Sequence, residues 1–117
     1  MHPLVALLVG ALSAIAGAHA FLDHAEPRVG TTVEAPPPAV TLFFTEPIEP
    51  AFSRVEIDDQ DGKKLATEPA RHPASDCLEL PLPALAPGEY TVHWAVVSVD
   101  THPTEGKFTF TVKGARR

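Results

Sequence analysis

The chain has little with which to cross-link itself or to bind nucleic acid. Cys77 is its only cysteine, so no internal disulfide can form and the fold must depend on packing. Acidic residues outnumber basic ones by 15 to 9, and with a net charge of −6 and no cluster of basic residues the chain is not expected to bind nucleic acid. A zinc cysteine pair, a phosphate-binding loop and a nucleophile elbow are also missing, which excludes the enzyme classes that carry those motifs.

A short apolar segment at the start of the chain indicates that the protein is exported. Residues 4–18 are rich in alanine, leucine and valine, but the run is too short to span a bilayer. It ends in small residues at Ala16 and Ala18, the pattern that precedes signal-peptidase cleavage. We therefore predict that residues 1–18 are a secretory signal peptide and that the mature protein is a soluble domain beginning at His19.

The position of the cut decides whether His19 is retained. The triplet Ala18-His19-Ala20 has the same spacing of small residues as the first site. Cleavage after Ala20 would leave Phe21 as the first residue and would remove His19 altogether. The sequence leaves both positions open.

The remainder of the chain is predicted to be all-β. It shows no 3.6-residue apolar period, and it holds 12 of the chain's 13 prolines, which oppose long helices. Short β-prone runs alternate with turn residues instead, as in a β-sandwich or Greek-key barrel. The expected strands, about seven in number, cover residues 20–25, 40–45, 53–58, 63–67, 77–82, 89–99 and 107–112. Residues 68–76 are expected to be a loop because they contain two prolines and no periodicity.

The longest expected strand carries much of the predicted core. Four of its apolar residues share one face by strict alternation: Tyr90, Val92, Trp94 and Val96. Tyr90 also follows directly after a Pro-Gly turn, as in the tyrosine corner of immunoglobulin-like sandwiches.

The single cysteine is expected to lie on the outer side of its strand. In residues 77–82 the leucines share one face, and Cys77 lies with Glu79 on the other. We therefore expect Cys77 to be partly exposed. An incidental thiol, a soft metal ligand and an intermolecular disulfide remain open as its role.

Three residues far apart in the sequence have the chemistry of a Cu(II) site. After cleavage behind Ala18, His19 offers an α-amine and an imidazole that can close a chelate ring on one ion. Asp100 and His102 stand two apart, and residues i and i+2 of an extended chain point to the same side. Such nitrogen and oxygen donors suit the tetragonal surroundings that Cu(II) prefers. We expect one ion here, bound less tightly at low pH because the nitrogen donors must lose protons.

The other histidines are expected to have ordinary roles. His24 lies near His19 in the sequence and is expected at the surface or behind the ligands, although a direct contribution stays open. His93 lies opposite the core face of its strand and is interpreted as structural. His72 precedes a proline and is interpreted as a solvated loop residue.

Several stretches of the chain resemble the CopC family of periplasmic copper-binding, copper-resistance proteins. The matching stretches are residues 19–27, 40–47, 88–92, 94–103 and 106–108. The most specific is Trp94-Ala95-Val96-Val97-Ser98-Val99-Asp100-Thr101-His102-Pro103. The resemblance covers residues 19–113 as one copper-binding domain, leaves 114–117 as a C-terminal tail, and implies an immunoglobulin-like Greek-key barrel.

The resemblance also implies ligands, location and partners. The family's Cu(II) site uses the mature N-terminal histidine and an Asp-x-His pair, which fall here on His19, Asp100 and His102. The expected function is a non-enzymatic periplasmic carrier or buffer of Cu(II), monomeric, with an inner-membrane transporter of the CopD type as a partner. The chain departs from methionine-rich members, because its only methionine is Met1. No thioether site for Cu(I) is therefore expected.

Two other function classes remain open from the sequence. A histidine brace, as in copper-dependent polysaccharide oxygenases, also uses an N-terminal histidine with a second histidine. Asp100 would fill the position that an oxygenase keeps open for oxygen, and Trp94 and Tyr90 are expected in the core, where they cannot bind sugar. A metal-free immunoglobulin-like interaction module would be indifferent to copper and to His19→Ala.

Overall fold

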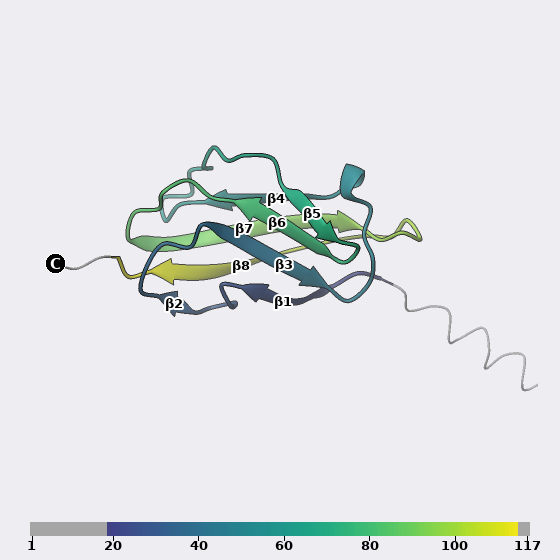
Figure 1. The fold of residues 1–117 in the computed structure, drawn as a ribbon, viewed down its shortest axis with the longest axis horizontal. Coiled ribbons are helices and arrows are strands. Elements are labelled where there is room, and N and C mark those ends of the chain that lie inside the picture. The colour runs from purple at the N-terminus through teal and green to yellow at the C-terminus, as the bar shows by residue number, and fades with distance from the viewer. Residues whose placement is uncertain (1–18, 115–117) are drawn as a thin grey trace, which may run out of the picture.

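The chain folds as two mostly antiparallel β-sheets packed face to face (Figure 1). The computed structural model describes residues 19–114. One sheet has the strand order β1-β3-β6-β5 and the other the order β2-β8-β7-β4. The elements are β1 (Leu22–Glu26), β2 (Thr32–Val33), β3 (Ala39–Phe44), the 3-10 turn η1 (Pro50–Phe52), β4 (Arg54–Asp58), β5 (Arg71–Ala74), β6 (Cys77–Pro81), β7 (Gly88–Val97) and β8 (Pro103–Val112). The all-β sandwich expected from the sequence is confirmed.

The hairpin of β7 and β8 is the longest paired unit of the fold. The two strands stay in antiparallel register from Gly88↔Val112 to Val97↔Pro103. In β7 every second residue from Tyr90 to Val96 is buried, so the predicted core face is confirmed. The Tyr90 hydroxyl donates to the Ala86 carbonyl at 2.6 Å, which confirms the tyrosine corner. This hairpin fixes where its own turn, residues 98–102, emerges at one end of the sandwich (Figure 1).

The two sheets meet in an aromatic and aliphatic core. Trp94 packs edge-on against Phe44 of the opposite sheet, with ring centroids 5.4 Å apart. Gly106 is the cross-strand partner of Trp94, and a Cβ atom at Gly106 would lie 2.6 Å from Cζ2 of the indole. Glycine at this position is therefore a steric requirement of the buried Trp94 side chain.

Several element predictions were wrong in detail. The expected strand 63–67 is reduced to a single bridge between Asp58 and Lys64, although Gly62 forms the predicted turn with a φ of 80°. The expected loop 68–76 contains β5, whose four exposed residues tolerate a proline because β5 is an edge strand. β8 begins at Pro103 rather than at residue 107, since pairing with β7 extends the strand into polar residues.

Cys77 is buried, which corrects the expectation that it is partly exposed. Its relative exposure is 2%. Its cross-strand partners are Phe43 on β3 and Ala74 on β5, and the His24 ring stacks on Phe43 at 4.3 Å. Because β6 lies between β3 and β5, side chains of the adjacent strands cover Cys77 on the outer face of the sheet. Desolvation, with Asp76 and Glu79 adding to it, raises the pKa of the Cys77 thiol.

The predicted signal peptide, residues 1–18, lies outside the described residues, as do residues 115–117 of the predicted tail. Among residues 19–114, no helix is long and apolar enough to cross a membrane.

Substitution of Gly106 tests the packing of the hairpin. We expect Gly106→Ala to lower the free energy of unfolding by about 1–3 kcal/mol, because the new methyl group must displace a buried, rigid indole. Urea denaturation followed by Trp94 fluorescence measures this. The exposed neighbour Lys107 provides the control, since Lys107→Ala should change stability by less than about 0.5 kcal/mol. Equal stability of both variants would contradict the steric argument.

The buried thiol should be chemically inert in the folded protein. Burial blocks access to Cys77, and its raised pKa leaves little reactive thiolate at neutral pH. We expect iodoacetamide to alkylate Cys77 slowly in buffer and rapidly in urea, as followed by mass spectrometry. Alkylation at the same rate in both conditions would show that the thiol is accessible.

Candidate metal centre

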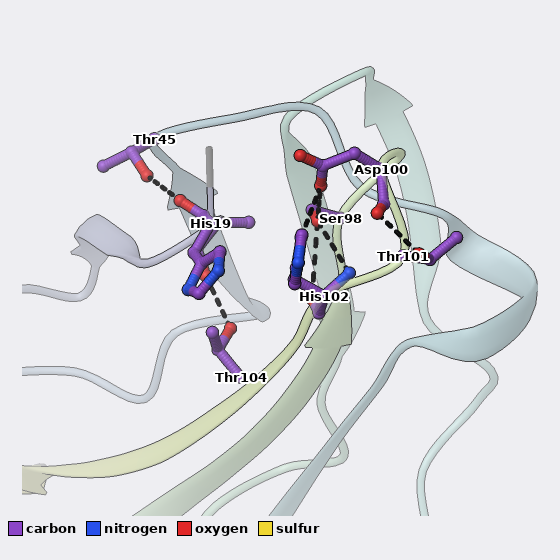
Figure 2. Close-up of polar contacts among 8 residues, drawn as sticks. His19, Thr45, Ser98, Asp100, Thr101, His102 and Thr104 are labelled. Atoms are coloured by element: carbon purple, nitrogen blue, oxygen red, sulfur yellow. Dashed lines mark hydrogen bonds and ion pairs between the residues drawn. The ribbon is translucent and has the colours of Figure 1, made fainter. Parts of the chain in front are cut away.

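The Asp100–His102 pair lies in the tight turn that joins β7 to β8 (Figure 2). Ser98 N–H donates to the His102 carbonyl at 3.1 Å, and Thr101 N–H donates to the Ser98 carbonyl at 2.8 Å. These bonds enclose a three-residue hairpin loop that ends in a residue of left-handed conformation, Thr101, with a φ of 71°. The two side chains do meet, with His102 Nδ1 3.2 Å from Asp100 Oδ1. The expected reason was wrong, because the turn and not an extended strand places them together.

Ser98 supports this turn from the protein interior. Its side chain is 1% exposed, whereas those of Asp100 and His102 are 43% and 53% exposed. The Ser98 hydroxyl donates to Asp100 Oδ1 and accepts a hydrogen bond from His102 N–H at 3.2 Å (Figure 2). One buried hydroxyl therefore contacts both predicted ligand residues.

These contacts favour the ionised form of Asp100. The hydrogen bond from Ser98, followed by the contact with the His102 ring, holds the pKa of the Asp100 carboxyl below its ordinary value. The carboxylate is consequently charged at neutral pH and available as an oxygen donor to a cation.

The first described residues run alongside this turn and bring His19 to it. Thr104 on β8 donates from Oγ1 to the Ala20 carbonyl at 2.5 Å. On the other side, Thr45 Oγ1 donates to the His19 carbonyl at 3.3 Å and accepts from Phe21 N–H at 3.0 Å. Two threonine hydroxyls thus hold the backbone on either side of Ala20, which is fully buried.

This anchoring places the His19 and His102 rings side by side (Figure 2). Their centroids are 4.4 Å apart and their planes are tilted by 34°. The structure thereby brings together all three residues predicted as metal ligands, from opposite ends of the domain sequence.

The donors are adjacent but are not yet arranged around a single point. Within residues 19–114, no three His, Cys, Asp or Glu side chains form a group that could hold an ion as they stand. Imidazole lone pairs lie in the ring plane, so rings in this arrangement must swing to direct one nitrogen each at a shared ion. The His19 nitrogen is also a peptide amide in the printed sequence, and only cleavage after Ala18 makes it an amine donor. The residue types fit Cu(II), and side-chain rotation with processing would complete the set.

The remaining histidines have other partners. His24 pairs with Asp23 at 2.8 Å and stacks on Phe43 on the outer face of its sheet. His93 pairs with Asp58 across β7 and β4 at 2.9 Å. His72 lies exposed on β5, close to the Ser75 carbonyl.

Sequence reasoning missed the supporting hydroxyls of the site. A signal for Ser98 was present, because the alternation that buries Tyr90 to Val96 also places residue 98 on the core face. A polar residue at a core position requires a hydrogen-bond partner. The roles of Thr45 and Thr104 depend on long-range contacts and left no such signal.

Comparison with known proteins supports one family. The sequence model of the CopC domain matches residues 22–113. The chain is 43% identical over 99 residues to Protein YobA of Escherichia coli K12, covering 82% of this chain and 80% of that one. It is 37% identical over 111 residues to copper resistance protein C of Xanthomonas campestris pv. juglandis, covering 86% and 85% of the two chains.

Solved structures agree with this match. CopC from Methylosinus trichosporium OB3b superposes with a TM-score of 0.79 at 40% identity, over 85% of this chain and 98% of that one. The methionine-rich copper resistance protein PcoC of Escherichia coli superposes with a TM-score of 0.75 at 30% identity, over 82% and 100% of the chains. Family domain, sequence relatives and fold coincide, and the chain therefore belongs to the CopC family of copper resistance proteins.

Proposed function

We propose that this protein is a periplasmic Cu(II)-binding protein that sequesters, buffers or carries one copper ion without chemical turnover. The ligands would be the amine and imidazole of His19, the carboxylate of Asp100 and the imidazole of His102. The observation that carries the proposal is the adjacency of these residues, with the histidine rings 4.4 Å apart and Asp100 in contact with His102.

The donor types favour Cu(II) over Cu(I). Nitrogen and oxygen donors suit Cu(II), whereas Cu(I) prefers soft sulfur ligands. The related PcoC is described as methionine-rich, but this chain has no methionine beyond Met1, and Cys77 is buried away from solvent. We therefore propose that the protein binds copper as Cu(II) and has no thioether site for Cu(I).

The exposure of the ligands suits a carrier. Asp100 and His102 are about half exposed in the turn, so another protein can approach a bound ion and exchange ligands with it. We infer that the recipient is a copper transporter of the inner membrane, of the CopD type, and that the protein acts as a monomer. Asp100 and His102 lie in the exposed turn between β7 and β8, which suits binding and release of an ion.

Copper binding should follow cleavage at Ala18 and should depend on His102. We expect protein exported from the full-length gene to begin at His19 and to retain one Cu(II) in native mass spectrometry. His102→Ala should lower the affinity at least tenfold, because it removes a nitrogen donor beside His19. His72→Ala is the matched control, since His72 is exposed on β5 and contacts none of the three ligand residues.

Three results would overturn the proposed function. The mature protein could begin at Phe21, it could begin at His19 and bind no copper, or His102→Ala could bind copper as tightly as the His72→Ala control. Production of peroxide from ascorbate by the copper-loaded protein would point to a copper oxidase instead.

Copper should be released on acidification before Asp100 is protonated. The lowered pKa keeps the Asp100 carboxylate charged down into its ordinary titration range, whereas imidazole and amine groups in general take up protons between about pH 8 and about pH 6. Affinity should therefore fall as the pH drops from about 7.5 to about 5. Competition titrations with a chelator of known affinity measure this. Affinity that stays constant over that interval would contradict nitrogen ligation.

A further inference from the structure

Ser98 is an unusual residue in this core. Among residues 19–114, it is the one buried residue that does not belong to the aliphatic, aromatic or sulfur-containing types of the core. A buried hydroxyl must be hydrogen-bonded to offset its lost hydration. The partners of the Ser98 hydroxyl are Asp100 Oδ1 and the backbone of His102, and both belong to the turn that carries the predicted ligands.

The turn that Ser98 supports is strained. Thr101, between the two ligand residues, has a φ of 71°, a conformation normally left to glycine or asparagine and unfavourable for a β-branched residue. Thr101 N–H is bonded to the Ser98 carbonyl, and its hydroxyl donates to the Asp100 carbonyl at 2.5 Å. Strained residues of this kind persist where surrounding contacts hold them, and they cluster at functional sites.

We propose that the Ser98 hydroxyl is a positioning residue for the copper site. It holds one carboxylate oxygen of Asp100 beside His102 before copper arrives, and it fixes the backbone amide of His102. This inference rests on the proposed function and deepens it, because it explains how a solvent-exposed Asp-x-His pair is kept in one arrangement. Ser98 itself does not bind the ion.

The geometry accounts for the choice of a serine. Alanine at position 98 would leave His102 N–H without its side-chain acceptor and would leave Asp100 Oδ1 with the His102 ring as its remaining side-chain partner. The exposed carboxylate could then turn toward water, and copper binding would have to order it again. Contacts behind a metal ligand typically change metal affinity by about 10–100-fold.

The test compares two serines of similar setting. Ser53 is part-buried, donates from Oγ to the Glu49 carbonyl at 2.7 Å and accepts from Val97 N–H at 3.1 Å. It supports the same end of β7 but touches neither Asp100 nor His102. We expect Ser98→Ala to weaken Cu(II) binding by about 10–100-fold and Ser53→Ala to leave it within about threefold, even if both lower stability alike.

A double-mutant cycle locates the effect. If Ser98 acts through Asp100, Ser98→Ala should cost little affinity once Asp100→Asn is in place, so the two losses would not add. The electron paramagnetic resonance spectrum of bound Cu(II) gives a second readout. It should shift in Ser98→Ala and stay unchanged in Ser53→Ala, because only the first alters how Asp100 is presented to the ion.

The outcomes separate this inference from the proposed function. Absence of Cu(II) binding by the wild-type protein would refute the proposed function and this inference with it. Normal binding by the wild type together with equal affinities of Ser98→Ala and Ser53→Ala would refute the role of Ser98 alone. Fully additive losses in the cycle with Asp100→Asn would show that Ser98 does not act through the Asp100 carboxylate, which would refute the proposed positioning of that ligand.

Discussion

The pairing of β7 with β8 is the constraint on which the rest of this domain depends. Its register places Trp94 over Gly106 and aligns the buried faces of both strands, which form one wall of the core. The same register ends the pairing of the two strands at Val97 and Pro103. Residues 98–102 connect the two strands, and the three-residue loop between Ser98 and His102 brings Asp100 back against His102. Core packing and site geometry are therefore consequences of a single alignment.

Alternation in the sequence was enough to identify the fold class and the main core face. Tyr90 and Trp94 behave as their spacing predicts because β7 is central, long and buried on one side only. Prediction failed where tertiary contacts override local pattern. β5 forms because the edge of β6 is open to pairing despite Pro73. Cys77 is buried because neighbouring strands cover it, and strand neighbours are not visible in a linear pattern.

For the site, the sequence identified donor types but not their arrangement. The donor chemistry of His19 and of the Asp-x-His pair is local and could be named in advance. The adjacency of these residues depends on two hydroxyls that bind the backbone at and next to His19. One belongs to Thr45, which follows β3, and the other to Thr104 on β8. Such contacts join positions up to 84 residues apart, and no periodicity encodes them. Only the buried position of Ser98 on the β7 alternation offered a hint.

In the site, the side chains that solvent can reach differ from the side chain that holds them in place. The Asp100 and His102 side chains, which would bind copper, are about half exposed, whereas Ser98 behind them is almost fully buried. Exposure lowers the barrier to ligand exchange, but an exposed carboxylate and imidazole lose conformational freedom when they bind an ion. A buried hydroxyl that holds the carboxylate in advance reduces that loss without covering the ion. In the proposed site, a carboxylate held by the buried Ser98 hydroxyl would permit tight binding, and exposed ligands would still permit transfer of the ion.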